Sequence, residues 1–338
     1  MIVTFGEIMM RLAPPGYQRF RQAKSFDIIY GGGEANVAAS LANFEKKARF
    51  VTKLPDNDIG KACKAELMSF GIDTDYIAIG GERLGLYFCE KGASQRPSKV
   101  VYDRAHSAIS ECDADDFDWE KIFDGAEWFH FTGITPAISD NAAAATLAAC
   151  KAAKAAGVKI SCDLNYRKKL WSKEKANKVM GELMQYVDVL IANEEDASDV
   201  FGISAAATDI TKGEISLAGY QSVAAQLIYR FGFEKVAITL RESISASHNN
   251  WSALLYDGKT YYSSKKYSIQ IVDRVGGGDS FGAGLIYGLT SGFDPQKALE
   301  FAVAASCLKH TIEGDVNMVT VPEVLALAGG DGSGRVQR

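Results

Sequence analysis

The chain has few of the residues that bind metal ions or form disulfides, with six cysteines and four histidines among its 338 residues. No Cys-x-x-Cys pair occurs, and the histidines lack the spacing of metal ligands. His130 stands inside the apolar run 128–131, where a structural role is favoured over a ligand role. Zinc chemistry therefore has no support, and free thiols in a reducing cytoplasm are expected.

Long apolar runs and an excess of positive charge are also missing. No stretch approaches the roughly 20 apolar residues of a membrane helix, and the chain starts directly in a strand-like run at 2–5, without a basic and apolar leader. The net charge of -5 argues against a surface built for nucleic acid. We therefore expect a cytoplasmic protein that binds small molecules, and neither nucleic acid nor membrane.

The composition, with 47% hydrophobic and 23% charged residues, is that of a globular protein with a large core. Short apolar runs alternate with helical ones over much of the chain. Strands are expected at 49–52, 128–131, 158–162, 187–192 and 236–240, and helices at 61–70, 141–156 and 176–185. This alternation is typical of a parallel sheet covered on both faces, which binds ligands beyond the carboxyl ends of its strands.

Two stretches, at about 7–30 and 86–102, interrupt this alternation with β-type runs and no helix between them. They predict either a small separate sheet, which would serve as a lid over a ligand cleft, or edge strands of the main sheet. The residues alone leave both open. Glycine-rich residues 329–335 have the composition of a linker and predict a disordered tail.

A glycine-rich run near the C-terminal end carries the strongest chemical signal. Residues 273–279 read Asp-Arg-Val-Gly-Gly-Gly-Asp, between a predicted strand at 267–272 and a predicted helix whose apolar positions recur every fourth residue from Phe281. Glycines at a helix N-terminus offer unpaired N–H groups to a phosphate, with Asp279 facing its reaction partner. This indicates phosphoryl transfer with a carboxylate base. A helix cap at Asp279 and a tight glycine turn are the alternative, and spacing alone leaves both open.

Two common nucleotide motifs do not describe this run. A Walker A loop needs Lys followed by Ser or Thr after its last glycine, and no such lysine is present. The dinucleotide fingerprint needs glycine at the sixth position from Gly276, where Phe281 stands, and an N-terminal βαβ unit around it.

Polar groups follow other predicted strands. A second glycine loop, at 31–33, enters a predicted helix, and its amides and Asn36 could bind sugar hydroxyls or merely turn the chain. Residues 163–167 follow the strand at 158–162, and Arg167 offers a bidentate fork for a carboxylate or a phosphate.

Two further segments carry alternatives of the same kind. Residues 193–196 could hold magnesium-bound water, although an Asn cap with acids in the first helical turn is favoured on local grounds. Tyr102 and Arg104 stand at the end of the predicted lid, where they could face a cleft, although a solvated surface arginine is the commoner case.

Taken together and in this order, the segments at 31–38, 163–167, 193–196 and 273–279 resemble the signatures of the ribokinase-like (PfkB) carbohydrate kinases. Within that family, several strings are similar to the 2-keto-3-deoxygluconate kinases. They stand at residues 6–12, 53–57, 163–167, 273–279 and 309–311. The likeness spans nearly the whole chain, short of the tail.

The resemblance implies an α/β fold, a three-layer α/β/α sandwich with a mostly parallel central sheet and a small β-sheet lid. The kinase domain would take up residues 1–325, with the lid formed from about 8–30 and 84–106, and residues 326–338 would be a disordered tail. ATP and Mg²⁺ are the implied cofactors. A homodimer through the open edge of the lid is a further possibility.

The family pattern also implies roles for single residues. Asp279 would be the catalytic base, with Gly276, Gly277 and Gly278 as the anion hole. The substrate would contact Gly33, Asn36, Tyr87, Tyr102, Arg104, Arg167 and Asp315. The nucleotide would lie along Asp163, Asn165, Asn193, Leu240, Arg241 and Ser243, with Asp196 serving the metal ion.

The chain departs from the family pattern at several positions. Glu45 and Pro55 stand where glycine is usual, and neither is expected to touch substrate. The middle acidic motif ends in Asp196 where Glu is usual, and the nucleotide loop carries Arg241 and Glu242 in place of a glycine. The last two departures concern the magnesium and adenosine contacts.

The function expected from the resemblance is ATP-dependent phosphorylation of the C6 hydroxyl of 2-keto-3-deoxygluconate. Arg104 and Arg167 would favour a substrate that carries a carboxylate. The alternatives are a kinase of a neutral sugar such as fructose, a non-catalytic sugar-binding protein on the same fold, and a nicotinamide oxidoreductase.

Overall fold

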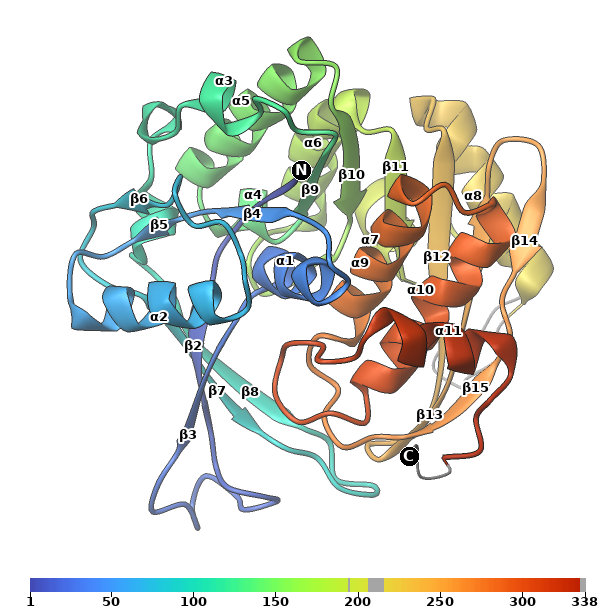
Figure 1. Cartoon of the computed structure of the whole chain (residues 1–338), viewed down its shortest axis with the longest axis horizontal. Coiled ribbons are helices and arrows are strands. Elements are labelled where there is room, and N and C mark those ends of the chain that lie inside the picture. Colours follow the sequence, from blue (N-terminus) through green and yellow to red (C-terminus); the bar gives the residue numbers. More distant parts are fainter. Residues whose placement is uncertain (194, 206–215, 335–338) are drawn as a thin grey trace.

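The structure, a computed structural model, describes residues 1–193, 195–205 and 216–334. Its main sheet runs β14-β13-β12-β11-β10-β9-β1-β4, with β15 paired to β13 (Figure 1). The strands are β1 Ile2–Phe5, β4 Ala48–Val51, β9 Trp128–Thr132, β10 Lys159–Asp163, β11 Val189–Ala192, β12 Lys235–Ser245, β13 His248–Tyr256, β14 Tyr261–Ser263 and β15 Tyr267–Gln270. The strands from β12 to β4 are parallel, and β13 joins β12 in the antiparallel sense.

Helices cover both faces of this sheet because alternate strand residues point to opposite sides. Leu190 and Ala192 of β11 belong to one buried cluster, and Val189 and Ile191 belong to the other. The first face carries α3 Trp119–Ile122, α5 Asp140–Ala155, α6 Lys173–Leu183, α7 Asp196–Phe201 and α8 Leu217–Phe231, and the second carries α1 Gly33–Asn43, α2 Asp58–Ser69, α9 Gly277–Thr290, α10 Pro295–Lys309 and α11 Val321–Gly329. The predicted three-layer fold is confirmed.

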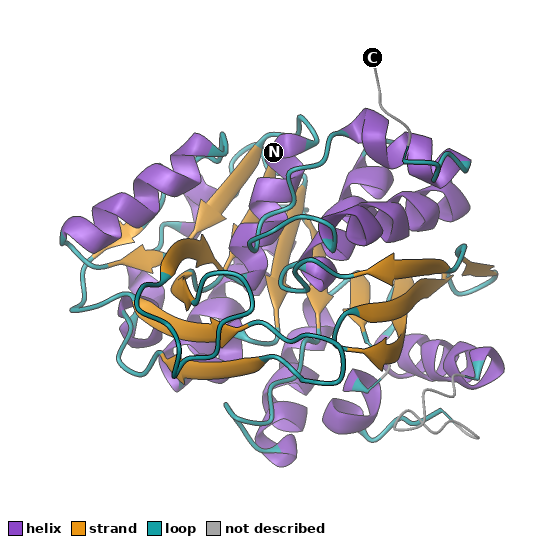
Figure 2. Cartoon of the chain, turned by 90° about the horizontal axis from the view of Figure 1, so that it is seen from below, coloured by secondary structure: helices purple, strands orange, loops and turns teal. Residues whose placement is uncertain are grey.

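A smaller sheet stands apart from the main one, below it in Figure 1 and across the front in Figure 2. Its order is β3-β2-β7-β8, from β3 Asp27–Gly31, β2 Met9–Ala13, β7 Gly85–Glu90 and β8 Lys99–Asp103. The separate sheet is therefore confirmed, and the alternative of edge strands in the main sheet is wrong. Two short strands, β5 Lys53–Leu54 and β6 Ala78–Ile79, form a further pair.

The predicted disordered tail begins too early. Helix α11 continues to Gly329, so residues 326–329 are helical. Thr320 and Glu323 form a capping box at its start, and Val324 is fully buried against the core. The tail prediction gave weight to the glycines and missed these start signals. Residues 335–338 of the predicted tail lie outside the described residues.

Helix α9 is held close to α10 by small residues. A Cβ atom at Gly284 would lie 2.8 Å from the Cα of Ala302, and one at Gly288 would lie 2.8 Å from the Cα of Ala298. Real Cβ atoms do not approach other carbons this closely, so the two backbones touch where a side chain would separate them. This contact holds the second half of α9 against α10.

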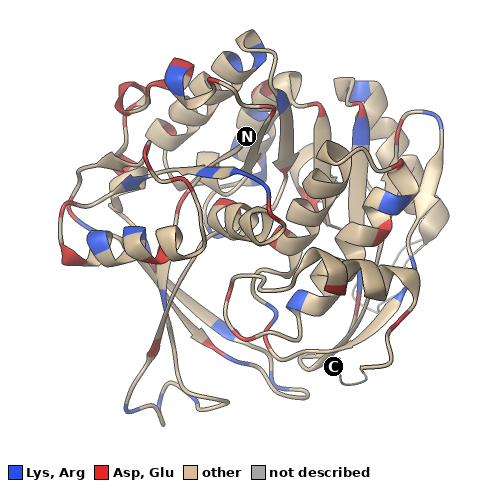
Figure 3. Ribbon diagram, viewed as in Figure 1, with Lys and Arg blue, Asp and Glu red and all other residues tan. Residues whose placement is uncertain are grey.

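Other features of the described chain agree with the composition. All six cysteines are free, and five of them are buried. Acidic and basic residues are interspersed over the elements (Figure 3). Among the described helices, none combines the length and the apolar character that crossing a membrane requires.

Glu45 shows why the family pattern has glycine there. It follows α1 with a φ of 61°, in the left-handed region, and the next residue donates its backbone N–H to the Leu41 carbonyl at 2.9 Å. This is the position after a helix end where glycine avoids a steric penalty of roughly 1–2 kcal/mol. The departure at Glu45 therefore places a strained residue at this helix end.

We expect Glu45→Gly to raise the free energy of unfolding by roughly 0.5–1 kcal/mol, because relief of the strain exceeds the added entropy of the unfolded chain. Glu66→Gly, at an exposed position inside α2, is the matched control and should lower stability by about 1 kcal/mol. Urea denaturation measures both. A loss of stability in Glu45→Gly similar to that of the control would contradict the explanation.

Candidate functional site

A cavity of about 490 Å³ lies where the small sheet faces the carboxyl ends of the parallel strands. Its size is within the range of small-ligand sites. The lining brings together all the predicted site residues except Leu240 and Ser243, namely Gly33, Asn36, Tyr87, Tyr102, Arg104, Asp163, Asn165, Arg167, Asn193, Asp196, Arg241, Gly276, Gly277, Gly278, Asp279 and Asp315.

The alternation of side chains along β12 explains the first exception, Leu240. Thr239 and Arg241 line the cavity, whereas Leu240 points to the opposite face and is buried in the core. Ser243 is exposed and lies outside the lining. Neither side chain reaches the cavity, so Arg241 is the predicted nucleotide residue of this strand that does.

The glycine turn at the start of α9 has the geometry of an anion site. Gly276 has a φ of 81°, and a Cβ there would lie 1.9 Å from the Asp315 carbonyl oxygen. A Cβ at Gly277 would lie 2.5 Å from the His310 ring, whereas Gly278 has open space. In the described part of the chain, the N–H groups of Gly278 and Asp279 donate to no protein acceptor. They are left for a ligand at the positive end of the helix.

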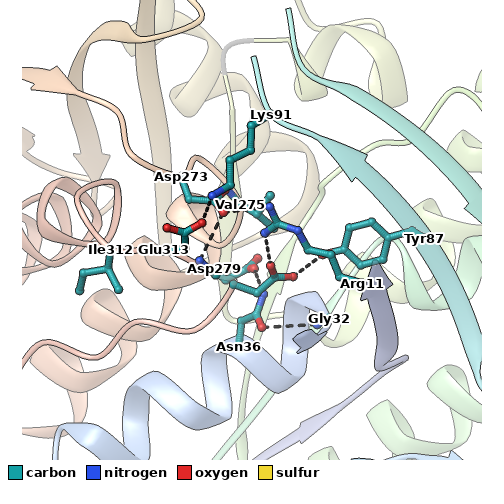
Figure 4. Close-up of polar contacts among 12 residues, drawn as sticks. Arg11, Gly32, Asn36, Tyr87, Lys91, Asp273, Val275, Asp279, Ile312 and Glu313 are labelled. Carbon is teal, nitrogen blue, oxygen red and sulfur yellow. Dashed lines mark hydrogen bonds and ion pairs between the residues drawn. The ribbon is translucent and has the colours of Figure 1, made fainter. Parts of the chain in front are cut away.

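Asp279 lies beside these amides, and its carboxylate faces the cavity. Asn36 donates its Nδ2 to Asp279 Oδ2 at 2.7 Å (Figure 4). Burial raises the pKa of Asp279 to about 6, opposed by the Asn36 hydrogen bond and the Arg167 charge. The residue that caps α9 is Gly276, without a side-chain cap, so the cap interpretation of Asp279 is wrong. The carboxylate is therefore available as a base near neutral pH.

Gly33 leaves space next to this carboxylate. A Cβ at Gly33 would lie 3.6 Å from Asp279 Oδ1 and 3.3 Å from the Thr132 methyl group. Any larger side chain would fill the position from which a hydroxyl group reaches the base. The predicted substrate contact at Gly33 is thus an open position beside Asp279.

Two more acids lie beyond the carboxyl ends of neighbouring strands: Asp163 is the last residue of β10, and Asp196 begins α7 shortly after β11. Burial raises the pKa of Asp163 well above its usual range, and the charges of Asp196 and Asp279 raise it further. Asp196 accepts the backbone N–H groups of Tyr166 at 3.1 Å and Asn193 at 3.0 Å. Asn193 accepts the N–H groups of Glu195 at 2.8 Å and Asp196 at 3.0 Å, but the residue that caps α7 is Glu195, without a side-chain cap. Glu194 of this motif lies outside the described residues.

These carboxylates fit a magnesium ion bound mainly through water and phosphate. No group of three or more His, Cys, Asp or Glu side chains within the described ranges is arranged to hold a metal ion. Mg²⁺ usually keeps several waters and takes one or two carboxylates together with substrate phosphates, which needs no such group. Asp163 and Asp196 line the cavity and supply oxygen atoms of this kind.

The two predicted substrate arginines differ in their surroundings. Arg104 donates its Nε to Glu7 Oε2 at 2.8 Å, and Glu7 also accepts the Ser107 hydroxyl at 2.7 Å. Arg167 donates to the Tyr166 carbonyl at 3.1 Å, and no carboxylate of the described residues pairs with it. Arg167 is therefore the cation available to an acidic ligand, and Arg104 is held in place by Glu7.

Glu7 was missed by the sequence analysis, as was a second charged residue nearby. Arg11, on β2, is fully buried and pairs with Asp273 at 2.9 Å and Asp315 at 2.6 Å. Tyr87 donates its hydroxyl to Asp315, so these two predicted substrate contacts bind each other (Figure 4). The sequence did contain a signal for Arg11, because this charged residue stands inside an apolar strand segment. Charged residues are buried only when they are paired, so its position predicts partners inside the protein.

Glu34 is the third residue that was missed. Its Oε1 accepts the Thr132 N–H at 2.8 Å and the hydroxyls of Thr132 and Thr135 at 2.9 and 2.7 Å. Burial raises the pKa of Glu34 to about 7. These bonds join the start of α1 to the end of β9 and to α4 Thr135–Ile138, which fixes the glycine loop against the main sheet.

Two arginines line the other end of the glycine turn. Arg274 donates to the Ala246 carbonyl at 3.2 Å, and it lines the cavity with Arg241 and Trp251. Burial, followed by the nearby charge of Arg241, lowers the pKa of Arg274. Two cations close enough to repel each other favour an anion with several charges between them.

Comparison with known proteins finds the family that the residues predict. The pfkB family carbohydrate kinases match residues 1–321. The solved structure of 2-dehydro-3-deoxygluconokinase from Thermotoga maritima is 56% identical, with a TM-score of 0.94, over 97% of this chain and 99% of that one. The 2-dehydro-3-deoxygalactonokinase of Haloferax volcanii is 34% identical over 331 residues, 98% of this chain and 97% of its own. The 2-dehydro-3-deoxygluconokinase of Thermoproteus tenax is 26% identical over 95% of this chain and 91% of its own. The predicted family resemblance is confirmed.

The pKa of Asp279 predicts the pH dependence of turnover. A base must be deprotonated, so kcat/KM should rise with pH up to about 6 and level off above it. Asn36→Ala removes a hydrogen bond that lowers this pKa, so the rising limb should move to higher pH. ADP release between about pH 5 and 8 measures both profiles. ATP titrates in the same way in both assays, so a difference between the two profiles comes from the protein. If the rising limbs of the wild type and Asn36→Ala coincide, Asp279 is not the titrating base.

Proposed function

Because the chain belongs to the pfkB family of carbohydrate kinases, we propose that it transfers the γ-phosphoryl group of ATP to the C6 hydroxyl of 2-keto-3-deoxygluconate, which is also called 2-dehydro-3-deoxygluconate. The single observation that carries the reaction type is the Asp279 carboxylate beside unpaired amides in the cavity. The likeness to the Thermotoga maritima enzyme supports the gluconate configuration of the substrate.

In this proposal Asp279 accepts the proton of the C6 hydroxyl as its oxygen bonds to the γ-phosphorus and the bond to ADP breaks. General base catalysis contributes roughly 10²–10⁴-fold to such a step. The N–H groups of Gly278 and Asp279 donate to the oxygens of the moving phosphoryl group, and the helix N-terminus favours its charge. The small sheet would exclude water, which competes as phosphoryl acceptor.

The acid end of the substrate would lie on Arg167. Its guanidinium binds a carboxylate in a bidentate manner, and it lines the cavity without a carboxylate of its own. Tyr102 and Arg104, from the lid, would contact the same end, and Gly33 would admit the C6 end to the base. Asn36 would act mainly on Asp279, because its Nδ2 is already used there.

The nucleotide would lie on the other side of the glycine turn. Arg241 and Arg274 would contact its phosphates, with Asn193 and Asn165 nearby. Asp163 and Asp196 would hold Mg²⁺ through water, as their surroundings allow. Magnesium, when bound, neutralises charge on the phosphates.

Assembly and location are part of the proposal. The lid sheet ends in two edge strands, β3 and β8, and exposes Phe26, Ile28 and Val101 with 39%, 60% and 54% of their surface. Open edges with apolar side chains pair readily with a second copy, so a homodimer through the lid is proposed. Six free cysteines support a cytoplasmic location.

The base assignment predicts that Asp279→Asn lowers kcat at least tenfold while the melting temperature stays within a few degrees, because the amide keeps the shape and cannot accept the proton. Asp140→Asn, at an exposed acid on α5, serves as the control and should keep full turnover. A coupled ADP-release assay with 2-keto-3-deoxygluconate decides. Near-normal turnover in Asp279→Asn would remove the proposed base.

The substrate assignment predicts that Arg167→Gln raises KM for the sugar acid roughly 10–100-fold, as expected for the loss of a charged hydrogen bond, with little change in KM for ATP. Lys168→Gln is the matched control for general attraction, since Lys168 is exposed next to Arg167. The same assay, run on keto-deoxy acids, ketohexoses and pentoses, compares substrates. Preference of the wild type for fructose would favour the neutral-sugar alternative.

A further inference from the structure

Arg11 joins the lid to the glycine turn from inside the protein. It lies on β2 of the small sheet with no exposed surface. One nitrogen, Nη2, donates to Asp273 Oδ2 at 2.9 Å, and the other, Nη1, donates to Asp315 Oδ1 at 2.6 Å (Figure 4). The guanidinium thus bridges two carboxylates that come from outside the lid.

Both carboxylates belong to the walls of the glycine turn. Asp273 accepts the Val275 N–H at 3.2 Å through Oδ1 and the Gly314 N–H at 3.3 Å through Oδ2. Asp315 places its carbonyl oxygen against Gly276, 1.9 Å from where a Cβ would stand. A shift of either aspartate would therefore move the backbone whose amides face the cavity.

The lid reaches the same loop at two further points. Tyr87, on β7, donates its hydroxyl to Asp315, and Lys91, just after β7, pairs with Glu313. Arg11 lies between these contacts and is the most buried of the three. These contacts join the lid and the glycine turn in one polar network, and the Arg11 guanidinium lies at its centre.

Stability alone does not account for Arg11. Its Nε is buried and has no hydrogen-bond partner among the residues that the structure describes. Burying a guanidinium and two carboxylates carries a desolvation penalty, and well-packed apolar residues often give equal stability. The geometry favours positioning as its role, because two carboxylates on separate chain segments are held by the two arms of one planar group.

We propose that Arg11 is a positioning residue of the phosphoryl-transfer reaction, which holds the glycine turn in register with the lid so that the Gly278 and Asp279 amides face the γ-phosphate. The inference rests on the proposed function. It does not require Arg11 to touch the substrate, since Arg11 lies outside the cavity lining.

The test is chemical rescue of Arg11→Ala. We expect kcat to fall at least tenfold, with the KM for the sugar acid within about threefold, and about 20–50 mM guanidinium chloride to restore several-fold of the loss by filling the vacated position. Potassium chloride at the same concentration should restore nothing. Arg49→Ala is the matched control: Arg49 pairs with Asp73 at 2.8 Å, away from the cavity, and its loss should leave kcat unchanged and unresponsive to guanidinium.

Wild-type kcat in folded Arg11→Ala, or a fall in kcat that guanidinium does not reverse, would overturn the proposal. If Arg11→Ala does not fold, Arg11→Lys gives the decision: a single ammonium nitrogen does not reproduce the planar group whose two separate nitrogens hold the two carboxylates, so kcat should still fall at least tenfold, and full activity would overturn the inference.

Binding of a non-hydrolysable ATP analogue separates the two proposals. Calorimetry should show weaker binding to Arg11→Ala than to the wild type, with recovery in guanidinium, and equal affinities would count against positioning. A wild type that phosphorylates no sugar acid would instead refute the proposed function, whatever the analogue shows.

Discussion

The absence of side chains at Gly276 and Gly277 is the constraint on which the site depends. A Cβ at Gly276 would overlap the Asp315 carbonyl, and one at Gly277 would strike the His310 ring. The turn can therefore lie directly on the segment that follows α10. Close packing of α9 on α10 at Gly284 and Gly288 holds the rest of the helix in line. These contacts set the direction of the amides at the start of α9. The helix has no side-chain cap there.

Charge in the cavity is arranged around this turn. Burial raises the pKa of Asp279, Asp163 and Asp196, and the positive charge of Arg167 opposes the effect on all three. Acids that repel each other in a low dielectric either take up a proton or pair with cations, so the cavity favours a bound cation. Strongly shifted pKa values of this kind cluster at functional sites.

The lid contributes side chains of two kinds. Tyr102 and Arg104 reach the cavity from β8 and the residue that follows it, and Glu7 fixes Arg104. Arg11 lies in a buried network with Asp315, and Tyr87 joins this network while it also lines the cavity. The same small sheet therefore both covers the cavity and contacts the segments that shape the anion site. The position of the lid therefore affects the geometry of the amides at the start of α9.

From the residues alone, local periodicity and turn chemistry predicted the alternation of strands and helices over much of the chain, the separate small sheet as one of two alternatives, and the glycine and acid signatures of the family. The sequence placed Asp279, Arg167 and the glycines at strand ends, where the cavity lies. The folded arrangement was needed to show that Leu240 faces the core, that Asn36 donates to Asp279, and that Arg11 pairs with Asp273 and Asp315. Arg11 and its partners are separated by 262 and 304 residues in the chain, and no local pattern links side chains that only folding brings together.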